Sequence, residues 1–225
     1  MIHDARVLRA GFVPQEVEHR DAEVTHLSSV LRPLTDGEPA DTALVTGPSG
    51  AGKTCISQFV TERLREEALD IEATYINCWR NHTRFRTLYQ LLDDIGKTID
   101  IHRQSTPHDE LIDRLQQYDG NRTVVILDEA DQLEDTSVIY DLHSLPQFAV
   151  ICITNNEEDL FGRVDDRLVS RLRASERVRM DTYSDEQLVD ILLARVKRGL
   201  EQGVVTDEQL YAIADAAAGD ARLAI

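Results

Sequence analysis

Cysteine, lysine and long apolar runs are scarce in this sequence, and their scarcity excludes several classes of protein. Its three cysteines, Cys55, Cys78 and Cys152, are far apart and form no Cys-x-x-Cys pair. Isolated cysteines in odd number argue against a disulfide framework or a zinc site and favour a reducing cytoplasm. The sequence has no run of about 18 apolar residues, so we expect no membrane span and no membrane partner. The charged N-terminus lacks the apolar core of a signal peptide.

The shortage of lysine accompanies a strong excess of acidic residues. Lysine occurs only at positions 53, 97 and 197, and 41 acidic residues against 24 basic ones give a formal net charge of −17. An acidic surface repels nucleic acid at long range and keeps a chain soluble through self-repulsion. High salt screens that repulsion within a few ångströms. The composition therefore favours a protein from a high-salt cytoplasm, and an ordinary acidic protein is the alternative.

The charge leads to a first testable prediction, that folding needs salt. Repulsion among 41 acidic residues is strong at low ionic strength and weakens as salt screens it. We expect the midpoint of a thermal melt to rise between low and molar potassium chloride. A midpoint that stays flat over this range would contradict the high-salt interpretation.

One of the three lysines lies in a glycine-rich segment, GPSGAGKT, which fits the pattern Gly-x-x-x-x-Gly-Lys-Ser/Thr. In such a loop, backbone N–H groups wrap the phosphates, the lysine reaches the terminal phosphates and the hydroxyl ligates Mg²⁺. A β-rich run at 41–46 precedes the segment, and apolar residues at helical spacing follow it. The context predicts a phosphate-binding loop made of Gly47, Pro48, Ser49, Gly50, Ala51, Gly52, Lys53 and Thr54.

Alternating strand-like and helix-like segments predict an α/β fold. After the run at 41–46, further β-like runs occur at 72–77, 123–127, 149–154 and 176–180, with helical patterns at 85–99 and 108–118. This alternation implies a five-stranded parallel sheet flanked by helices on both faces. The continuous apolar runs at 123–127 and 149–154 are typical of central strands that are buried on both sides.

The pattern becomes all-helical near the end of the sequence. Ser184 followed by Gln187, and Thr206 followed by Gln209, predict capping boxes at two helix starts, with a break between the helices at 199–203. We therefore expect three parts: an N-terminal arm (1–40), an α/β core (41–181) and a partial helical lid (182–225).

Polar residues at the ends of two predicted strands complete a candidate site. Asp128 and Glu129 follow one strand, and Asn155 follows the next. Ligands bind at the carboxyl ends of strands in open α/β sheets. We predict that Asp128 holds Mg²⁺, directly or through water, and that Glu129 polarises the water that attacks the γ-phosphate. Asn155 could hydrogen-bond the γ-phosphate and that water, and a simple turn asparagine is the alternative.

The order of these motifs resembles that of an AAA+ ATPase. Gly47–Thr54, Asp128–Glu129 and Thr154–Asn155 are followed by DDRLVSRL at 165–172 and GDARLAI at 219–225. FVPQEVEHR at 12–20, INC at 76–78 and the closing GDAR resemble the archaeal replication initiators, which are related to the eukaryotic origin-recognition complex and cell-division-cycle loading factor. The resemblance covers nearly the whole chain, and it implies a P-loop AAA+ core followed by the start of a helical lid. Acidic members of this family from halophiles would explain the charge.

The resemblance implies roles for individual residues. Lys53 and Thr54 would bind phosphate and Mg²⁺, Asp128 and Glu129 would form the Walker B pair, and Asn155 would be sensor one. Arg222 would be sensor two, an arginine that the lid lowers onto the γ-phosphate. Three residues of the N-terminal arm would pack around the adenine: Val13, Pro14 and Arg20. Two arginines match the region that supplies an arginine finger to a neighbouring subunit, and either could instead be a surface residue: Arg167 and Arg171.

The resemblance implies a slow, switch-type, Mg²⁺-dependent ATPase that binds ATP and ADP within an origin-recognition protein. Its partners would be DNA at replication origins and other initiator or helicase-loading subunits. Two alternatives are an AAA+ ATPase of another DNA transaction, such as a transposition helper or clamp-loader-like protein, and a non-catalytic nucleotide-dependent scaffold.

Two expectations concern DNA. The segment 80–86 carries three arginines where the family has a helical insertion that touches DNA, and a solvated charged face is the alternative. Tyr75 and Trp79, which lie nearby, are expected to be packing residues rather than base-stacking ones. The family's winged-helix DNA-binding domain does not follow the partial lid here, which implies either a truncated sequence or a relative without that domain.

Overall fold

The computed structural model describes residues 2–9, 11–102, 106–164 and 166–225. Within these residues the chain forms a parallel sheet of five strands in the order β2-β3-β4-β1-β5. Their bounds are Ala43–Thr46 (β1), Ile71–Asn77 (β2), Arg122–Asp128 (β3), Phe148–Thr154 (β4) and Glu176–Arg179 (β5). Each expected strand is present, and the bounds differ from the expected ones by at most two residues.

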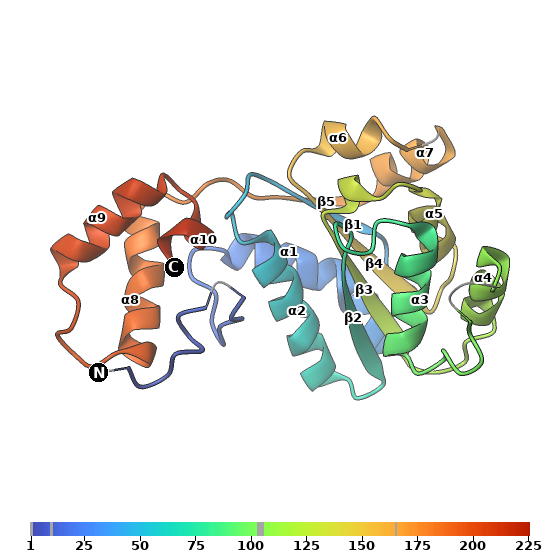
Figure 1. Cartoon of the computed structure of the whole chain (residues 1–225), viewed down its shortest axis with the longest axis horizontal. Helices are drawn as coiled ribbons and strands as arrows, with labels where there is room; N and C mark the ends of the chain where they lie inside the picture. The colour runs from blue at the N-terminus through green and yellow to red at the C-terminus, as the bar shows by residue number, and fades with distance from the viewer. Residues whose placement is uncertain (1, 10, 103–105, 165) are drawn as a thin grey trace.

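Helices cover both faces of the sheet, as the alternating pattern predicts. Helices α1 and α2 lie on one face, and α3, α4 and α5 lie on the other (Figure 1). The bounds on the first face are Asp21–Leu31 (α1), the 3₁₀ turn Arg32–Asp36 (η1) and Lys53–Glu67 (α2). The remaining core helices are Arg84–Asp94 (α3), His108–Gln116 (α4), the 3₁₀ turn Ala130–Gln132 (η2), Ser137–His143 (α5), Glu157–Phe161 (α6) and Asp166–Ala174 (α7).

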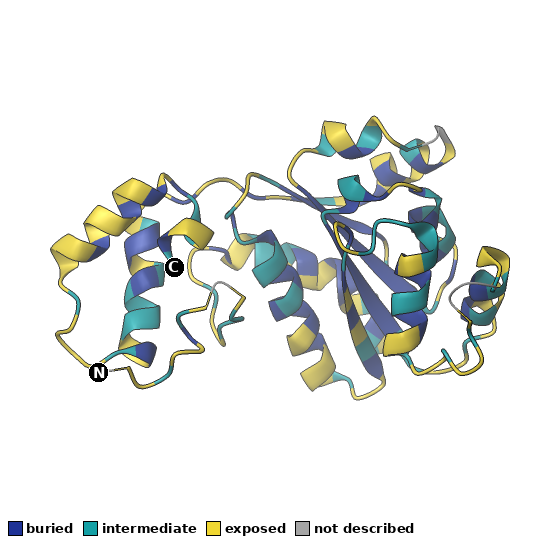
Figure 2. Ribbon diagram, viewed as in Figure 1, coloured by how far each residue is buried: buried dark blue, intermediate teal, exposed yellow. Residues whose placement is uncertain are grey.

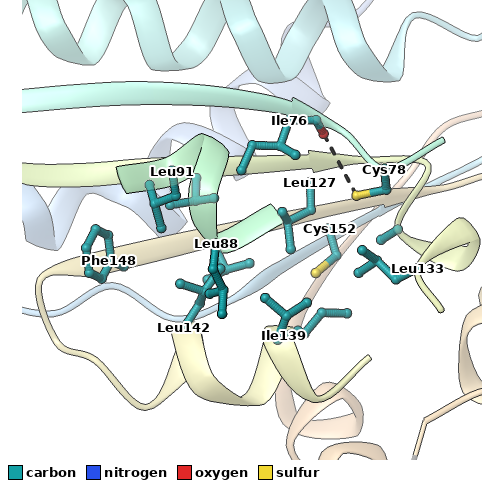
Figure 3. Packing of buried hydrophobic residues seen from close by; sticks show 14 of the residues in the cluster. Ile76, Cys78, Leu88, Leu91, Leu127, Leu133, Ile139, Leu142, Phe148 and Cys152 are labelled. Atoms are coloured by element: carbon teal, nitrogen blue, oxygen red, sulfur yellow. Dashed lines mark hydrogen bonds between the residues drawn. The ribbon is translucent and has the colours of Figure 1, made fainter. Parts of the chain in front are cut away.

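Strand β4 shows how the sheet is held between two apolar layers. Val150 and Cys152 point into the cluster formed with α3, α4 and α5, which Figure 3 shows in part. Ala149, Ile151 and Ile153 point into the opposite cluster, beneath α1 and α2. All seven residues of β4 are buried, which explains the uninterrupted apolar sequence of this central strand.

Helix α3 is shorter than the pattern at 85–99 predicts. It ends at Asp94 because Gly96 adopts a left-handed conformation with a φ of 70°. The N–H of Lys97 then donates to the carbonyl of Leu92 at 2.7 Å and closes the helix end. The glycine therefore stops the helix although apolar spacing continues beyond it.

The last residues form a helical unit with its own small core. Helices α8 (Asp185–Gly199), α9 (Asp207–Ala217) and α10 (Ala221–Ala224) pack around buried Leu188, Leu192 and Leu210 (Figure 2). Both expected capping boxes are present, at the starts of α8 and α9. This unit agrees with a lid beginning near residue 182, although that boundary stays a prediction. Among the described helices, none combines the length and the apolar character needed to cross a membrane.

The N-terminal residues contact the helical unit. Ile2 forms an antiparallel bridge with Leu200, and the N–H of His3 donates to the carbonyl of Gly199 at 2.8 Å. Farther along the arm, the ring nitrogen of His19 lies 2.9 Å from the carboxylate of Asp190 on α8. The arm is thus joined to α8 within the helix, at Asp190, and at its C-terminal end.

Candidate nucleotide-binding site

The candidate site lies at the carboxyl edge of the sheet, between the core, the arm and the helical unit. The sheet order makes β1 and β3 both neighbours of β4, so the segments that follow these three strands meet at one edge. The same edge carries a pocket. The core contributes Ser49, Gly50, Gly52, Lys53, Thr54, Cys55, Asp128, Glu129, Ile153, Thr154 and Asn155; the arm contributes Pro14, Glu16, Val17 and Glu18; and the helical unit and the residues leading into it contribute Tyr183, Ile191, Ala194, Arg195, Ala221, Arg222 and Ile225.

The glycine-rich loop connects β1 to α2, as the motif requires. Gly50 and Gly52 have φ angles of 70° and 94°, a left-handed conformation that side chains disfavour. A Cβ atom at Gly50 would collide with the carboxylate of Asp220, and one at Gly52 would lie 2.7 Å from the Tyr183 hydroxyl. Helix α2 begins at Lys53, and its free N–H groups and dipole favour an anion at this point. The loop therefore has the geometry of a phosphate-binding site.

Lys53 is buried at the centre of the pocket. Its ammonium donates to the carbonyls of Gly47 and Pro48, both at 2.7 Å, and to Oδ1 of Asn155 at 2.9 Å. Burial lowers the pKa of Lys53, and the charge of Asp128 partly offsets this effect. The oxygens around this buried ammonium are neutral. A phosphate would add the negative charge that pairs with it, so the position is suited to bind a phosphate oxygen.

Thr54 and Asp128 supply the oxygens expected for a metal ion. The Thr54 hydroxyl donates to Oδ2 of Asp128 at 2.8 Å. A hydroxyl and a carboxylate next to a phosphate-binding loop are the ligands that Mg²⁺ prefers, together with phosphate oxygens and water. The donor set therefore fits Mg²⁺.

Tyr75 also contacts this pair, which the sequence did not indicate. The tyrosine lies on β2, and its hydroxyl donates to the same Oδ2 of Asp128 at 2.7 Å. Its side chain is 40% exposed and Trp79 is 67% exposed. The two residues were expected to be packing residues rather than base-stacking ones, and the exposure of both argues against a packing role.

Glu129 and Asn155 stand beside the phosphate-binding loop. Glu129 has a φ of 58°, which costs a residue other than glycine about 1 kcal/mol or more and is typical of functional sites. The alternative was that Asn155 is a simple turn asparagine. The next residue, Asn156, is the one that makes a local backbone contact: its side chain accepts the N–H of Glu158 at 3.0 Å and caps α6. The side chain of Asn155 instead accepts a hydrogen bond from the ammonium of Lys53.

The helical unit places Arg222 at the pocket and is attached to the loop. The N–H of Ala221 donates to the carbonyl of Gly50 at 3.2 Å. Asp220 caps the short helix α10 by accepting the N–H of Arg222 at 2.8 Å. Arg222 lines the pocket and lies near enough to Lys53 that its charge lowers the pKa of that lysine.

Of the three residues that were expected to pack around the adenine, one lines the pocket and two do not. Pro14 lines the pocket, whereas Val13 packs against the apolar cluster beneath α1 and α2. Arg20 is buried: it donates to the carbonyls of Ala51, at 3.2 Å, and Asp181, and its guanidinium lies 4.2 Å from the centre of the Tyr183 ring. Arg20 itself is not among the residues that line the pocket, and its expected place around the adenine stays a prediction.

Arg195 on α8 is a pocket residue that the sequence did not indicate. Its guanidinium donates to three carbonyls of the arm, those of Val7 at 2.6 Å, Arg9 at 3.1 Å and Phe12 at 3.4 Å. Apolar spacing cannot reveal such a contact, since it joins residues more than 180 positions apart. Arg195 thus holds the arm against the helical unit beside the pocket.

We predict that Arg195→Ala weakens ATP binding on the order of tenfold but changes turnover at saturating ATP little. The arm would lose three hydrogen bonds, while the phosphate-side residues of the core would stay in place. Steady-state kinetics measure the two effects separately. Arg198→Ala is the control, because Arg198 reaches the arm through one hydrogen bond, to Gln15. A fall in turnover at unchanged affinity would contradict the assignment.

The expected arginine-finger residues lie on α7, outside the pocket of their own chain. Arg171 stacks 4.6 Å from the centre of the Tyr140 ring, and Arg167 is exposed. A finger acts on a neighbouring subunit, so this placement does not decide between them. Asp165, the first residue of the same motif, is outside the described residues. In the segment 80–86, Arg84 pairs with Asp141 at 2.7 Å, and the other two arginines are exposed.

Comparison with known proteins agrees with the fold and the motifs. A family model described as an AAA domain matches residues 37–164. ORC1-type DNA replication protein 9 of Halobacterium salinarum is 82% identical over all 225 residues, which span 64% of that relative. ORC1-type DNA replication protein 1 of the same organism is 57% identical over the whole chain, which spans 73% of it. Both relatives agree with the high-salt origin that the charge indicates.

A solved structure leads to the same family. The ORC1 protein of Aeropyrum pernix, solved in complex with DNA, matches with a TM-score of 0.83 and 27% identity, over 99% of this chain and 62% of that one. The identity, the coverage and the fold agree with the order of the motifs around the pocket. The chain contains an AAA domain and belongs to the ORC1-type DNA replication proteins.

Proposed function

We propose that this chain is the ATP-binding and ATP-hydrolysing module of a replication-origin-recognition protein, with ATP acting as a switch of conformation and assembly. One observation carries the proposal: Lys53, Thr54, Asp128, Glu129 and Asn155 converge on a single pocket, which the helical unit closes with Arg222. Side chains suited to hold phosphate, to hold a metal ion and to activate water therefore line the same pocket, which supports the proposal.

Each residue would have a separate role. Lys53 and the loop N–H groups would hold the phosphates, and Thr54 and Asp128 would hold Mg²⁺, which supplies positive charge to the phosphate oxygens when bound. Glu129 would accept the proton of the attacking water, and Asn155 would orient that water against the γ-phosphate. Hydrolysis would be slow in a single chain, because an arginine finger, Arg167 or Arg171, would come from a neighbouring subunit.

The switch would act through the contact between α10 and the loop. Ala221 and Asp220 touch Gly50, so a change in the loop on nucleotide binding would be transmitted to the helical unit. Arg222 would bind the γ-phosphate of ATP and release it after hydrolysis. The unit and the arm would then move together, because Arg195 joins them.

A phosphate-release assay with the purified chain in molar potassium chloride tests the proposal against a non-catalytic scaffold. Slow phosphate release that requires Mg²⁺ supports an ATPase, and binding without any release would favour the scaffold. Membership of the ORC1-type family argues against a transposition helper or a clamp-loader-like protein. We propose that the whole protein works in the cytoplasm with origin DNA and with other initiator or helicase-loading subunits.

We predict that this chain by itself binds duplex DNA weakly. Its net charge of −17 opposes the phosphate contacts that supply most non-specific affinity. Arg84 is paired with Asp141, which leaves Arg80 and Arg86 as the exposed arginines of the segment 80–86. Fluorescence anisotropy with a labelled origin-like duplex measures this binding, beside a fluorescent ATP analogue that should still bind. Submicromolar DNA binding would show that the chain carries a main DNA-binding surface.

A further inference from the structure

Asp128 receives two hydrogen bonds on one carboxylate oxygen, from two different parts of the core. Thr54 donates to Oδ2 at 2.8 Å from the start of α2, and Tyr75 donates to Oδ2 at 2.7 Å from β2. Strand register explains the second contact. Asn77 lies opposite Asp128 in the β2–β3 pair, so Tyr75 is the diagonal neighbour, within reach of a long side chain.

The Tyr75 hydroxyl is well suited to be a permanent donor. At neutral pH a tyrosine phenol carries an O–H donor, and the ionised carboxylate of Asp128 can only accept it. Its ring is not part of the apolar clusters formed by the described residues, and its hydroxyl donates to Oδ2 of Asp128 at 2.7 Å. Asp128 is 7% exposed and cannot exchange this donor freely for water.

The two hydrogen bonds to Oδ2 determine the orientation of the Asp128 carboxylate. A carboxylate held by one donor can rotate about its Cβ–Cγ bond, whereas donors from two elements fix its plane. Among the described residues, Oδ1 has no hydrogen-bond donor, so it is the oxygen left for a metal ion or for its bound water. Partners of this kind orient metal ligands, and losing one typically costs 10–100-fold in metal affinity.

We propose that Tyr75 is a positioning residue for the Mg²⁺-nucleotide complex: its hydroxyl fixes the carboxylate of Asp128 so that Oδ1 serves Mg²⁺. The inference rests on the proposed function, because it presumes that the pocket binds ATP with Mg²⁺. It adds a residue from β2 to a site that otherwise consists of the segments after β1, β3 and β4.

Tyr75→Phe tests the proposal, because it removes the hydroxyl and keeps the ring. A fluorescent ATP analogue is titrated in EDTA and at rising Mg²⁺. We expect the affinity in EDTA to stay within about twofold of the parent, and the Mg²⁺ concentration for half-maximal tightening to rise about tenfold. Tyr118→Phe is the control, because Tyr118 stacks on Phe148 at 5.8 Å and lies outside the pocket. It should leave both values unchanged.

A second measurement uses the protein without nucleotide or metal. Thermal melts of Tyr75→Phe, Asp128→Asn and the double variant form a cycle, and a direct contact predicts that their effects do not add. Additive effects, or a Tyr75→Phe variant with the parent's Mg²⁺ dependence, would overturn the proposal. Equal weakening in EDTA and in Mg²⁺ would also overturn it, since that result indicates general damage to the pocket. A parent chain that binds no nucleotide would overturn the proposed function as well.

Discussion

Lys53→Ala is expected to abolish ATP binding in any practical assay, with an affinity at least about 100-fold below that of the parent chain. Each hydrogen bond from a charged donor is worth about 1.5–3 kcal/mol, and the ammonium of Lys53 can make two such bonds to phosphate oxygens. The lysine is buried among oxygens at the centre of the pocket, so no other lysine can replace it. Binding of a fluorescent ATP analogue measures the loss.

Lys97→Ala provides a matched control for this experiment. It removes the same charge from an acidic chain, but Lys97 lies near the ring of Tyr118, at 5.8 Å from its centre, and outside the pocket. Its affinity for ATP should equal that of the parent. Thermal melts of both variants show that each is folded. ATP binding by Lys53→Ala at the parent's affinity would refute the assignment of the loop.

Glu129→Gln is expected to keep ATP binding and to lose hydrolysis by about 100-fold or more. Glutamine has the shape of glutamate but cannot accept the proton of the attacking water, and general base catalysis is worth about 10²–10⁴-fold. Phosphate release in a single turnover, measured beside the binding of the ATP analogue, separates the two effects.

Glu134→Gln is the matched control, because it makes the same substitution at a glutamate outside the pocket. Glu134 is an exposed residue that pairs with His82 at 3.4 Å, and it does not line the pocket. This variant should hydrolyse ATP at the parent rate. Hydrolysis at the parent rate by Glu129→Gln would instead show that another group activates the water.

The sequence was sufficient to predict the sheet, because its signals are local. Buried strands such as β3 and β4 are continuous apolar runs, and the capping boxes at Ser184 and Thr206 need only a residue and its third neighbour. The phosphate-binding loop and the residues after β3 and β4 are also local patterns. Strand order then brings them together, since parallel strands place their carboxyl ends at one edge.

The contacts that the sequence did not predict join residues far apart along the chain. Tyr75 on β2 contacts Asp128 at the end of the neighbouring strand β3, and Arg195 binds the arm from α8. Arg20 was expected to pack around the adenine, and its guanidinium lies against the ring of Tyr183, a residue that lines the pocket. The residues around Tyr75 and Arg195 do not distinguish either of them from a surface residue, because their partners lie far away along the chain.

Calorimetric titration of ATP into the purified chain, in molar potassium chloride with Mg²⁺, tests the central claim most directly. The account predicts one saturable site per chain, displaced by ADP and weakened when EDTA removes Mg²⁺, because Lys53, Thr54 and Asp128 line one pocket and would together hold the phosphates and the metal ion. A folded chain that gives no binding heat, or binding that ADP does not displace, would contradict it.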